Sequence, residues 1–352
     1  MSKKHFNALS AVCIASAASL STPAIAQSSV SLYGLIDGFV GEVKNPGAHS
    51  ATVMQGGGMS TSFWGLRGTE DLGGGYSTYF VLESYFQPNN GTFGRFANDS
   101  FFSRNAYVGL ATPYGSIRAG RLTTPLYIST INQNPFFNSY TFSPWILHTY
   151  KGLGPQGVVG DSGWNNAVAY STPNWAGLTG QLIYSFGNSA SQPSSKKWGG
   201  QLAYANGPFQ LTANYQWINY SNLAGDIATS LPGVTGRQSQ ATAQLAGSYN
   251  FNVVRVFAGY MNIRDKAAPG TITTNTEHIG VTIPVGASSI LAALAYSKSS
   301  GTNSNDVNRL TWSVGYDYPL SKRTDAYAGF KYDRYDSLST GLTYGVGLRH
   351  QF

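Results

Sequence analysis

The downstream part of the chain alternates between apolar and polar residues with a period of two. Between Asn308 and Tyr318, apolar or aromatic residues occupy every even-numbered position from 310, and smaller or polar residues occupy the odd-numbered ones. The segment from Leu342 to Phe352 repeats the pattern. Successive side chains of a β-strand point to opposite faces, so such a segment buries one face in an apolar medium and wets the other. No segment shows a comparable 3.6-residue period, and the sequence therefore predicts an all-β fold.

Sixteen segments of this kind can be counted, and the connections between them alternate in length. The predicted strands are 29–43, 59–71, 75–86, 100–111, 114–121, 164–172, 177–187, 197–205, 208–219, 238–250, 252–265, 273–284, 287–299, 306–318, 322–335 and 341–352. The long connections are 44–58, 87–99, 122–163, 188–196, 220–237, 266–272, 300–305 and 336–340. An even strand number, with short turns at one rim and long loops at the other, is typical of an antiparallel transmembrane β-barrel.

A soluble β-sandwich or propeller would also alternate, but the second face of these strands is unsuited to a dry core. It carries Thr, Ser, Gln, Asn, Gly and isolated charges, which are costly in an apolar interior and natural in a water-filled lumen. Only 11% of residues are charged and 14% are aromatic, whereas a disordered chain would be rich in charge and poor in aromatic residues. After the N-terminus no apolar run is long enough for a transmembrane helix.

The first 26 residues have the pattern of a secretory signal peptide. Two lysines precede an apolar stretch, and the small residues Ala24 and Ala26 predict cleavage before Gln27. We therefore expect a removable segment, 1–26, followed by a barrel, 27–352. The single cysteine lies inside the removable segment, so the exported barrel has no disulfide and no thiolate metal ligand.

Residues that carry catalysis or bind metals are sparse. After the predicted signal peptide the histidines are His49, His148, His278 and His350, and none has the spacing of a metal or catalytic site. The basic residues are scattered singly, which argues against a nucleic-acid surface. We expect no metal, no cofactor, no nucleic-acid partner and no enzymatic activity. The enzyme alternative, a lipid-hydrolysing barrel, would need a serine beside a histidine on the lipid-facing side, where His350 is the candidate.

Five motifs resemble the general diffusion porins of Gram-negative β-proteobacteria, and the similarity covers essentially all of 27–352. They are Gln27-Ser28-Ser29-Val30-Ser31-Leu32-Tyr33-Gly34 followed by Asp37, Trp64-Gly65-Leu66-Arg67-Gly68-Thr69-Glu70-Asp71-Leu72-Gly73-Gly74-Gly75, Ser103-Arg104-Asn105-Ala106-Tyr107-Val108-Gly109-Leu110, Gly120-Arg121 and Gly347-Leu348-Arg349-His350-Gln351-Phe352. The resemblance implies a 16-stranded barrel assembled as a homotrimer in the outer membrane, surrounded by lipid and lipopolysaccharide, with the third long loop folded into the lumen. It also implies that the barrel assembly machinery reads alternate residues of the last strand, namely Tyr344, Val346, Leu348, His350 and Phe352.

In that family, wall arginines face acidic groups across a constriction, and the opposed charges create a transverse field that sets ion preference. Arg104 matches one wall arginine, and Glu83 stands where the wall glutamate is expected. A second arginine is replaced here by Phe63, a third is missing near 163–164, and the loop acid of some relatives is replaced by Phe136. The predicted constriction residues are Arg104, Glu83, Arg118, Arg121, Phe63, Phe136 and Tyr140.

The third loop, predicted at 122–163, is poor in acid and rich in aromatic residues. There is no Asp or Glu from Ser100 to Gly160, and Asp161 is the only acid of the loop. The rings either line the pore or pack the loop against the wall, and the sequence leaves both interpretations open.

A third loop with few carboxylates repels anions less, so the loss of these groups favours the permeation of anions over cations. We expect a passive channel for ions and small hydrophilic solutes that prefers anions. The alternative is a substrate-selective channel whose aromatic loop binds sugars or aromatic acids, and a minor alternative is an adhesin built on the outer loops.

Overall fold

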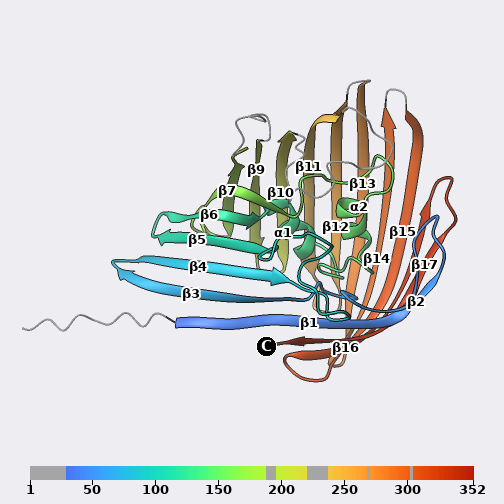
Figure 1. Cartoon of the computed structure of the whole chain (residues 1–352), viewed down its shortest axis with the longest axis horizontal. Coiled ribbons are helices and arrows are strands. Elements are labelled where there is room, and N and C mark those ends of the chain that lie inside the picture. Colours follow the sequence, from blue (N-terminus) through green and yellow to red (C-terminus); the bar gives the residue numbers. More distant parts are fainter. Residues whose placement is uncertain (1–28, 188–195, 220–236, 268–269, 302–303) are drawn as a thin grey trace, which may run out of the picture.

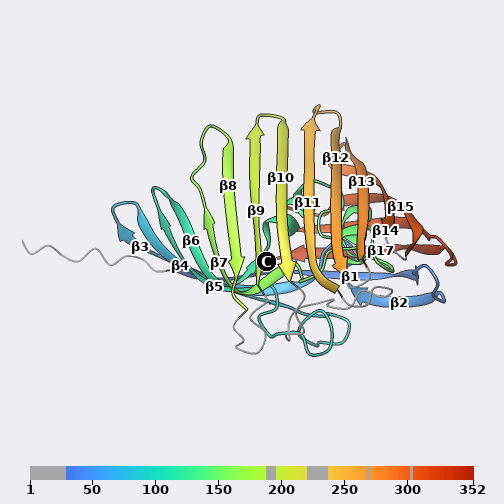
Figure 2. The same cartoon turned by 90° about the horizontal axis from the view of Figure 1, so that it is seen from above.

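The strands form one closed antiparallel sheet in which neighbours in sequence are neighbours in space. The computed structural model describes residues 29–187, 196–219, 237–267, 270–301 and 304–352. The first strand pairs with the last from Leu35 opposite Gln351 to Lys44 opposite Leu342, which closes the ring. Figures 1 and 2 show the strands following one another around the barrel. Closure leaves no unpaired sheet edge, as a structure surrounded by lipid requires.

The bounds of the strands follow the predicted segments closely in most of the chain. They are β1 (Ser29–Lys44), β2 (Ala51–Gly56), β3 (Phe63–Gly73), β4 (Tyr76–Tyr85), β5 (Asn105–Thr112), β6 (Gly115–Thr123), β7 (Gly163–Ser171), β8 (Leu178–Ser185), β9 (Lys197–Asn206), β10 (Phe209–Asn219), β11 (Arg237–Asn250), β12 (Arg255–Ala267), β13 (Gly270–Val285), β14 (Ser288–Gly301), β15 (Ser304–Pro319), β16 (Thr324–Tyr335) and β17 (Gly341–Gln351). Because β2 and β3 pair with successive parts of β1, they make one interrupted strand, and the ring has the sixteen strands that the alternation predicts.

The alternation places polar side chains inside the ring and apolar side chains outside. On β15, Arg309, Thr311 and Ser313 are 2%, 0% and 1% exposed, whereas Val314 and Tyr316 are 44% and 43% exposed. A water-soluble protein shows the opposite arrangement, because burial of its apolar residues drives folding. The outer surface of this barrel is therefore suited to hydrocarbon and its interior to water.

The structure corrects several boundaries near the long-loop rim. The connection predicted at 44–58 contains β2, and the strand predicted from residue 100 begins at Asn105. The connections predicted at 266–272 and 300–305 are mostly strand, since β12 to β15 run to within two residues of each other. Strands can continue into water beyond the apolar band, where hydrophobic alternation no longer marks them. The loops predicted at 188–196 and 220–237 and the segment 1–26 lie almost wholly outside the described residues.

The third loop folds inward and contains two short helices that the sequence pattern does not predict, α1 (Pro125–Asn132) and α2 (Pro144–Tyr150). Each begins with a hydroxyl cap followed by proline, a favoured helix start. Thr124 Oγ1 accepts from the Tyr127 amide at 3.2 Å, and Ser143 Oγ accepts from the Ile146 amide at 3.3 Å. The first helix packs on β9 to β11 and the second on β13 to β15. Neither helix is long and apolar enough to cross a membrane.

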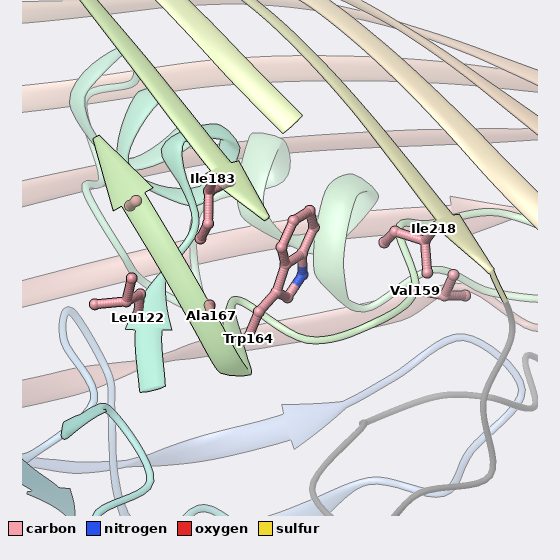
Figure 3. Close-up of a cluster of buried hydrophobic side chains, with 7 residues drawn as sticks. Leu122, Val159, Trp164, Ala167, Ile183 and Ile218 are labelled. Carbon is pink, nitrogen blue, oxygen red and sulfur yellow. The ribbon is translucent and has the colours of Figure 1, made fainter. Parts of the chain in front are cut away.

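An apolar cluster fixes the two ends of the third loop to the wall. Trp164, at the start of β7, is fully buried among Leu122 from the end of β6, Val159 from the loop, Ile183 and Ile218 (Figure 3). Because both the exit and the return of the loop belong to one cluster, the loop starts and ends at a fixed height in the barrel.

Candidate pore constriction

Three rings and a proline of the third loop press against glycines on the lumen side of the wall. The pairs are Phe136 with Gly315, Phe142 with Gly329, Trp145 with Gly259 and Pro135 with Gly280. A Cβ atom added to any of these glycines would lie between 2.6 and 3.0 Å from the partner ring. The rings of Phe136, Phe142 and Trp145 are fully buried. Because these glycines have no side chains, the loop can pack directly against four strands of the wall.

Phe136 illustrates what the structure adds to the two interpretations of the loop aromatics. This predicted constriction residue belongs to an apolar cluster with Phe39, Met59 and Phe142 and has no exposed surface. Its position fits packing of the loop and not contact with a solute. Tyr140 is different, because it is only partly buried and lines a cavity beside Lys151.

The interruption between β2 and β3 receives the middle of the third loop. Ser139 Oγ donates to the Gly58 carbonyl at 2.6 Å, and Thr141 Oγ1 donates to the Gly57 carbonyl at 2.9 Å. The interruption is itself held by Asp37, whose buried carboxylate accepts the amides of residues 58, 59 and 60 at 3.1, 2.9 and 2.7 Å. Asp37 on β1 thus positions the loop through the backbone between the two strands.

The Asp37→Asn variant is expected to loosen this attachment, because an amide group accepts fewer hydrogen bonds than a carboxylate. Hydrogen bonds to charged groups contribute about 1.5–3 kcal/mol each, so loop attachment should weaken by an amount of that order. The expected result in a planar bilayer is a noisier single-channel current with frequent excursions above the wild-type level. Tyr327→Phe, which removes one donor to the same carboxylate, should have a smaller effect; equal or absent effects would contradict the role of Asp37.

Glu83 and Arg104, two of the predicted constriction residues, form an ion pair. Arg104 Nη1 lies 2.5 Å from Glu83 Oε1. The same carboxylate accepts from the Tyr33 hydroxyl at 2.7 Å and from the Asn105 amide. The guanidinium of Arg104 also lies 4.1 Å from the centre of the Phe63 ring, a cation–π contact. Three predicted residues, Arg104, Glu83 and Phe63, therefore stand together on the wall.

A second charged network joins the wall to the third loop through Asp161. Its carboxylate lies 2.7 Å from Arg121 Nη2 and 2.7 Å from Arg95 Nη1, and Arg95 Nε lies 2.8 Å from Asp99. Burial would raise the pKa of Asp161, but the two arginines outweigh that effect and lower the pKa to about 2. Arg95 and Asp99 were not among the predicted site residues. Asp99 and Asp161 are the acids that flank the acid-free stretch of the sequence, and both bind Arg95.

Three further lumen cations, Arg118, Arg67 and Lys151, have no acidic partner among the residues that the structure describes. Arg118 on β6 donates to Ser171 Oγ at 3.2 Å, and its guanidinium lies 5.9 Å from the ring centre of Tyr107. Arg67 stacks on Tyr33 at 4.8 Å, and the Lys151 amine lies 5.8 Å from the centre of the Tyr140 ring. Desolvation by the surrounding protein and the nearby Arg309 lower the pKa of Lys151.

The remaining candidate residues lie away from the constriction. Within the described ranges no group of three or more His, Cys, Asp or Glu side chains could hold a metal ion. His350 faces outward on the last strand, and its Nδ1 contacts Thr324 Oγ1 at 2.9 Å. The residues predicted as the assembly signal lie exposed in one outward row with it, namely Tyr344, Val346, Leu348 and Phe352.

A closed barrel with an apolar exterior, a polar lumen and a charged loop narrowing that lumen defines a transmembrane channel. The family described as Gram-negative porin matches residues 8–338, so the chain belongs to this family. It is 30% identical to outer membrane porin protein 32 of Delftia acidovorans, over 94% of this chain and 95% of that protein. An outer membrane porin of Bordetella pertussis is 28% identical, over 93% and 95%.

Among solved structures, an anion-selective porin from Comamonas acidovorans matches with a TM-score of 0.77 and 25% identity, over 93% of this chain and 100% of that one. The resemblance noted in the sequence is thereby confirmed. The chain is an outer-membrane porin, a passive diffusion channel.

Proposed function

We propose that this porin prefers anions among the ions and small hydrophilic solutes that diffuse through it. The observation that carries the proposal is an imbalance of paired and unpaired charge. Three of the acids that face the lumen, Glu83, Asp161 and Asp333, each lie within 2.5 to 2.8 Å of an arginine, and the Asp37 carboxylate is enclosed by backbone amides. Arg67, Arg118 and Lys151 have no such partner in the described part of the chain. Unpaired cations along a narrow waterway with low-dielectric walls concentrate anions inside it. The likeness to an anion-selective porin supports the same preference.

The Arg118→Gln variant is expected to reduce this preference without closing the pore. Removing one unpaired charge in a solvated lumen changes the energy of a permeating ion by roughly 1 kcal/mol or less. The chloride-to-potassium permeability ratio should therefore fall by up to about fivefold. Reversal potentials across a bilayer with a KCl gradient measure the ratio. Arg323→Gln, in the exposed turn before β16, is the matched control and should leave it unchanged. Cation preference of the wild type would contradict the proposed function.

We further propose the finer properties that the family resemblance implies. Residues 1–26 are removed on export, the barrel assembles as a homotrimer in contact with lipopolysaccharide, and the assembly machinery reads the outward row that ends in Phe352. The channel has no enzymatic activity, in keeping with the porin family and with the contact of His350 Nδ1 to the Thr324 hydroxyl. Mass spectrometry of the mature N-terminus, native-gel mobility and a lipid-hydrolysis assay test these points separately.

The second candidate function is a channel with a binding site for particular solutes. It is favoured by one specific observation, a cavity beside Tyr140 that is lined by aromatic and hydrogen-bonding side chains. Saturable block of the current by a solute distinguishes this function from general diffusion.

A further inference from the structure

A cavity of about 450 Å³ opens between the end of β2, the connection that follows β4 and the third loop. It lies directly beside the network of Arg95 and Asp161 that ties the third loop to the wall. Its volume falls in the range of small-molecule sites. The polar and aromatic side chains of its lining include Gln55, Gln87, Asn89, Phe96, Tyr140 and Lys151.

Three amide side chains of this cavity lack protein partners. No side-chain hydrogen bond to another residue in the described ranges is made by Gln55, Gln87 or Asn89. Each amide offers two donors and a carbonyl acceptor. A solute with several hydroxyl groups satisfies such a set, whereas a plain aromatic acid would leave the amides with water alone.

The charge and the apolar surface of the cavity further limit the class of solute that can bind there. Asp161 is the acid that lines it, and both of its oxygens are occupied by arginines. Lys151 is partly desolvated by its surroundings but keeps exposed surface, and its amine forms no ion pair in the described part of the chain and lies 5.8 Å from the centre of the Tyr140 ring. Phe96, in the connection that follows β4, is half exposed. Aromatic rings offer flat apolar surfaces to the C–H faces of a sugar, and the free ammonium offers a partner for one carboxylate.

We propose that this cavity is a binding subsite for sugar acids, with the carboxylate on Lys151, the hydroxyl groups on the amides of Gln55, Gln87 and Asn89, and the ring against Tyr140. The subsite rests on the proposed anion preference and specifies which organic anions the pore retains. Because it lies beside the Arg95–Asp161 network, where the third loop meets the wall, a bound sugar acid obstructs the flow of small ions while it stays.

The test is current block by sodium D-glucuronate in a planar bilayer holding the full-length mature channel in KCl. Wild type should show a concentration-dependent reduction of chloride current that saturates, and D-glucose at the same concentrations should block far less. Lys151→Gln should raise the half-blocking concentration of glucuronate about tenfold or more, since a charge-assisted hydrogen bond is lost. Gln87→Ala should also raise it. Lys322→Gln, the same change in an exposed turn, should have no effect.

Two outcomes overturn the subsite. One is linear, unsaturated behaviour of wild type with glucuronate, and the other is equal block of wild type and Lys151→Gln. Benzoate blocking as strongly as glucuronate would replace the sugar acid by an aromatic acid and contradict the role of the amides. Reversal potentials in KCl alone keep the two proposals apart: anion preference without saturable block refutes only the subsite, and cation preference refutes the proposed function.

Discussion

A channel carrying Phe136→Glu is expected to conduct more current than the wild type and to fluctuate among several levels. The ring is fully buried on Gly315 among Phe39, Met59 and Phe142. Truncating a buried phenylalanine typically costs about 3–5 kcal/mol, and an unpaired carboxylate in that apolar site adds several more. The substituted segment should leave the wall, so the third loop no longer narrows the lumen. Single-channel conductance and limited proteolysis of the loop both report this change.

Phe137→Glu is the matched control, because it places the same charge one residue further along. Phe137 is 49% exposed, so its ring is not needed to hold the loop. We expect wild-type conductance, protease resistance equal to the wild type and a modest shift towards cations. If Phe136 instead lined the pore, both variants would shift selectivity alike and neither would raise conductance. That result would favour the lining interpretation of the loop aromatics.

The strand architecture was predictable because the membrane imposes one rule on every strand. Outward positions must be apolar and inward positions face water. The alternation in β15 and β17 therefore predicts which side chains point outward and where each strand begins and ends. The rule stops at the rim of the hydrocarbon. There β12 to β15 continue as paired strands in which polar residues predominate, and β2 lies inside a predicted loop, because backbone pairing extends beyond the apolar band.

The third loop was less predictable, because its partners come from distant strands. Glycines at 259, 280, 315 and 329 look like ordinary strand glycines until a loop ring is found on each. The helices have only two turns, too few for a period, although Thr124-Pro125 and Ser143-Pro144 are visible start signals. Arg95 was missed for the same reason: in the sequence it neighbours Asp99 alone, and only the fold brings Asp161 to it.

Asp161→Asn is expected to release the returning end of the third loop and to raise anion preference together. The substitution leaves Arg95 and Arg121 without the carboxylate that both now bind, and losing one partner of a buried ion pair typically costs about 3–5 kcal/mol. It also removes the single acid of the loop. Reversal potentials should move further towards the chloride equilibrium value, and the midpoint of heat unfolding should fall. Asp306→Asn, which breaks an exposed pair with Lys298, should change neither.

Unfolding measured at low pH distinguishes this electrostatic effect of Asp161→Asn from a simple packing defect. The pKa of Asp161 is about 2 in the folded barrel and close to 3.9 in an unfolded chain, so its ion pairs stabilise the fold fully above about pH 4. The stabilisation disappears as the pH falls from about 4 to 2, because the carboxyl group then becomes protonated in both states. The gap in unfolding midpoint between wild type and Asp161→Asn should therefore be constant from pH 7 to about 4 and close towards pH 2. A gap that persists at pH 2 would mean that Asp161 acts through shape, and that its charge does not anchor the loop.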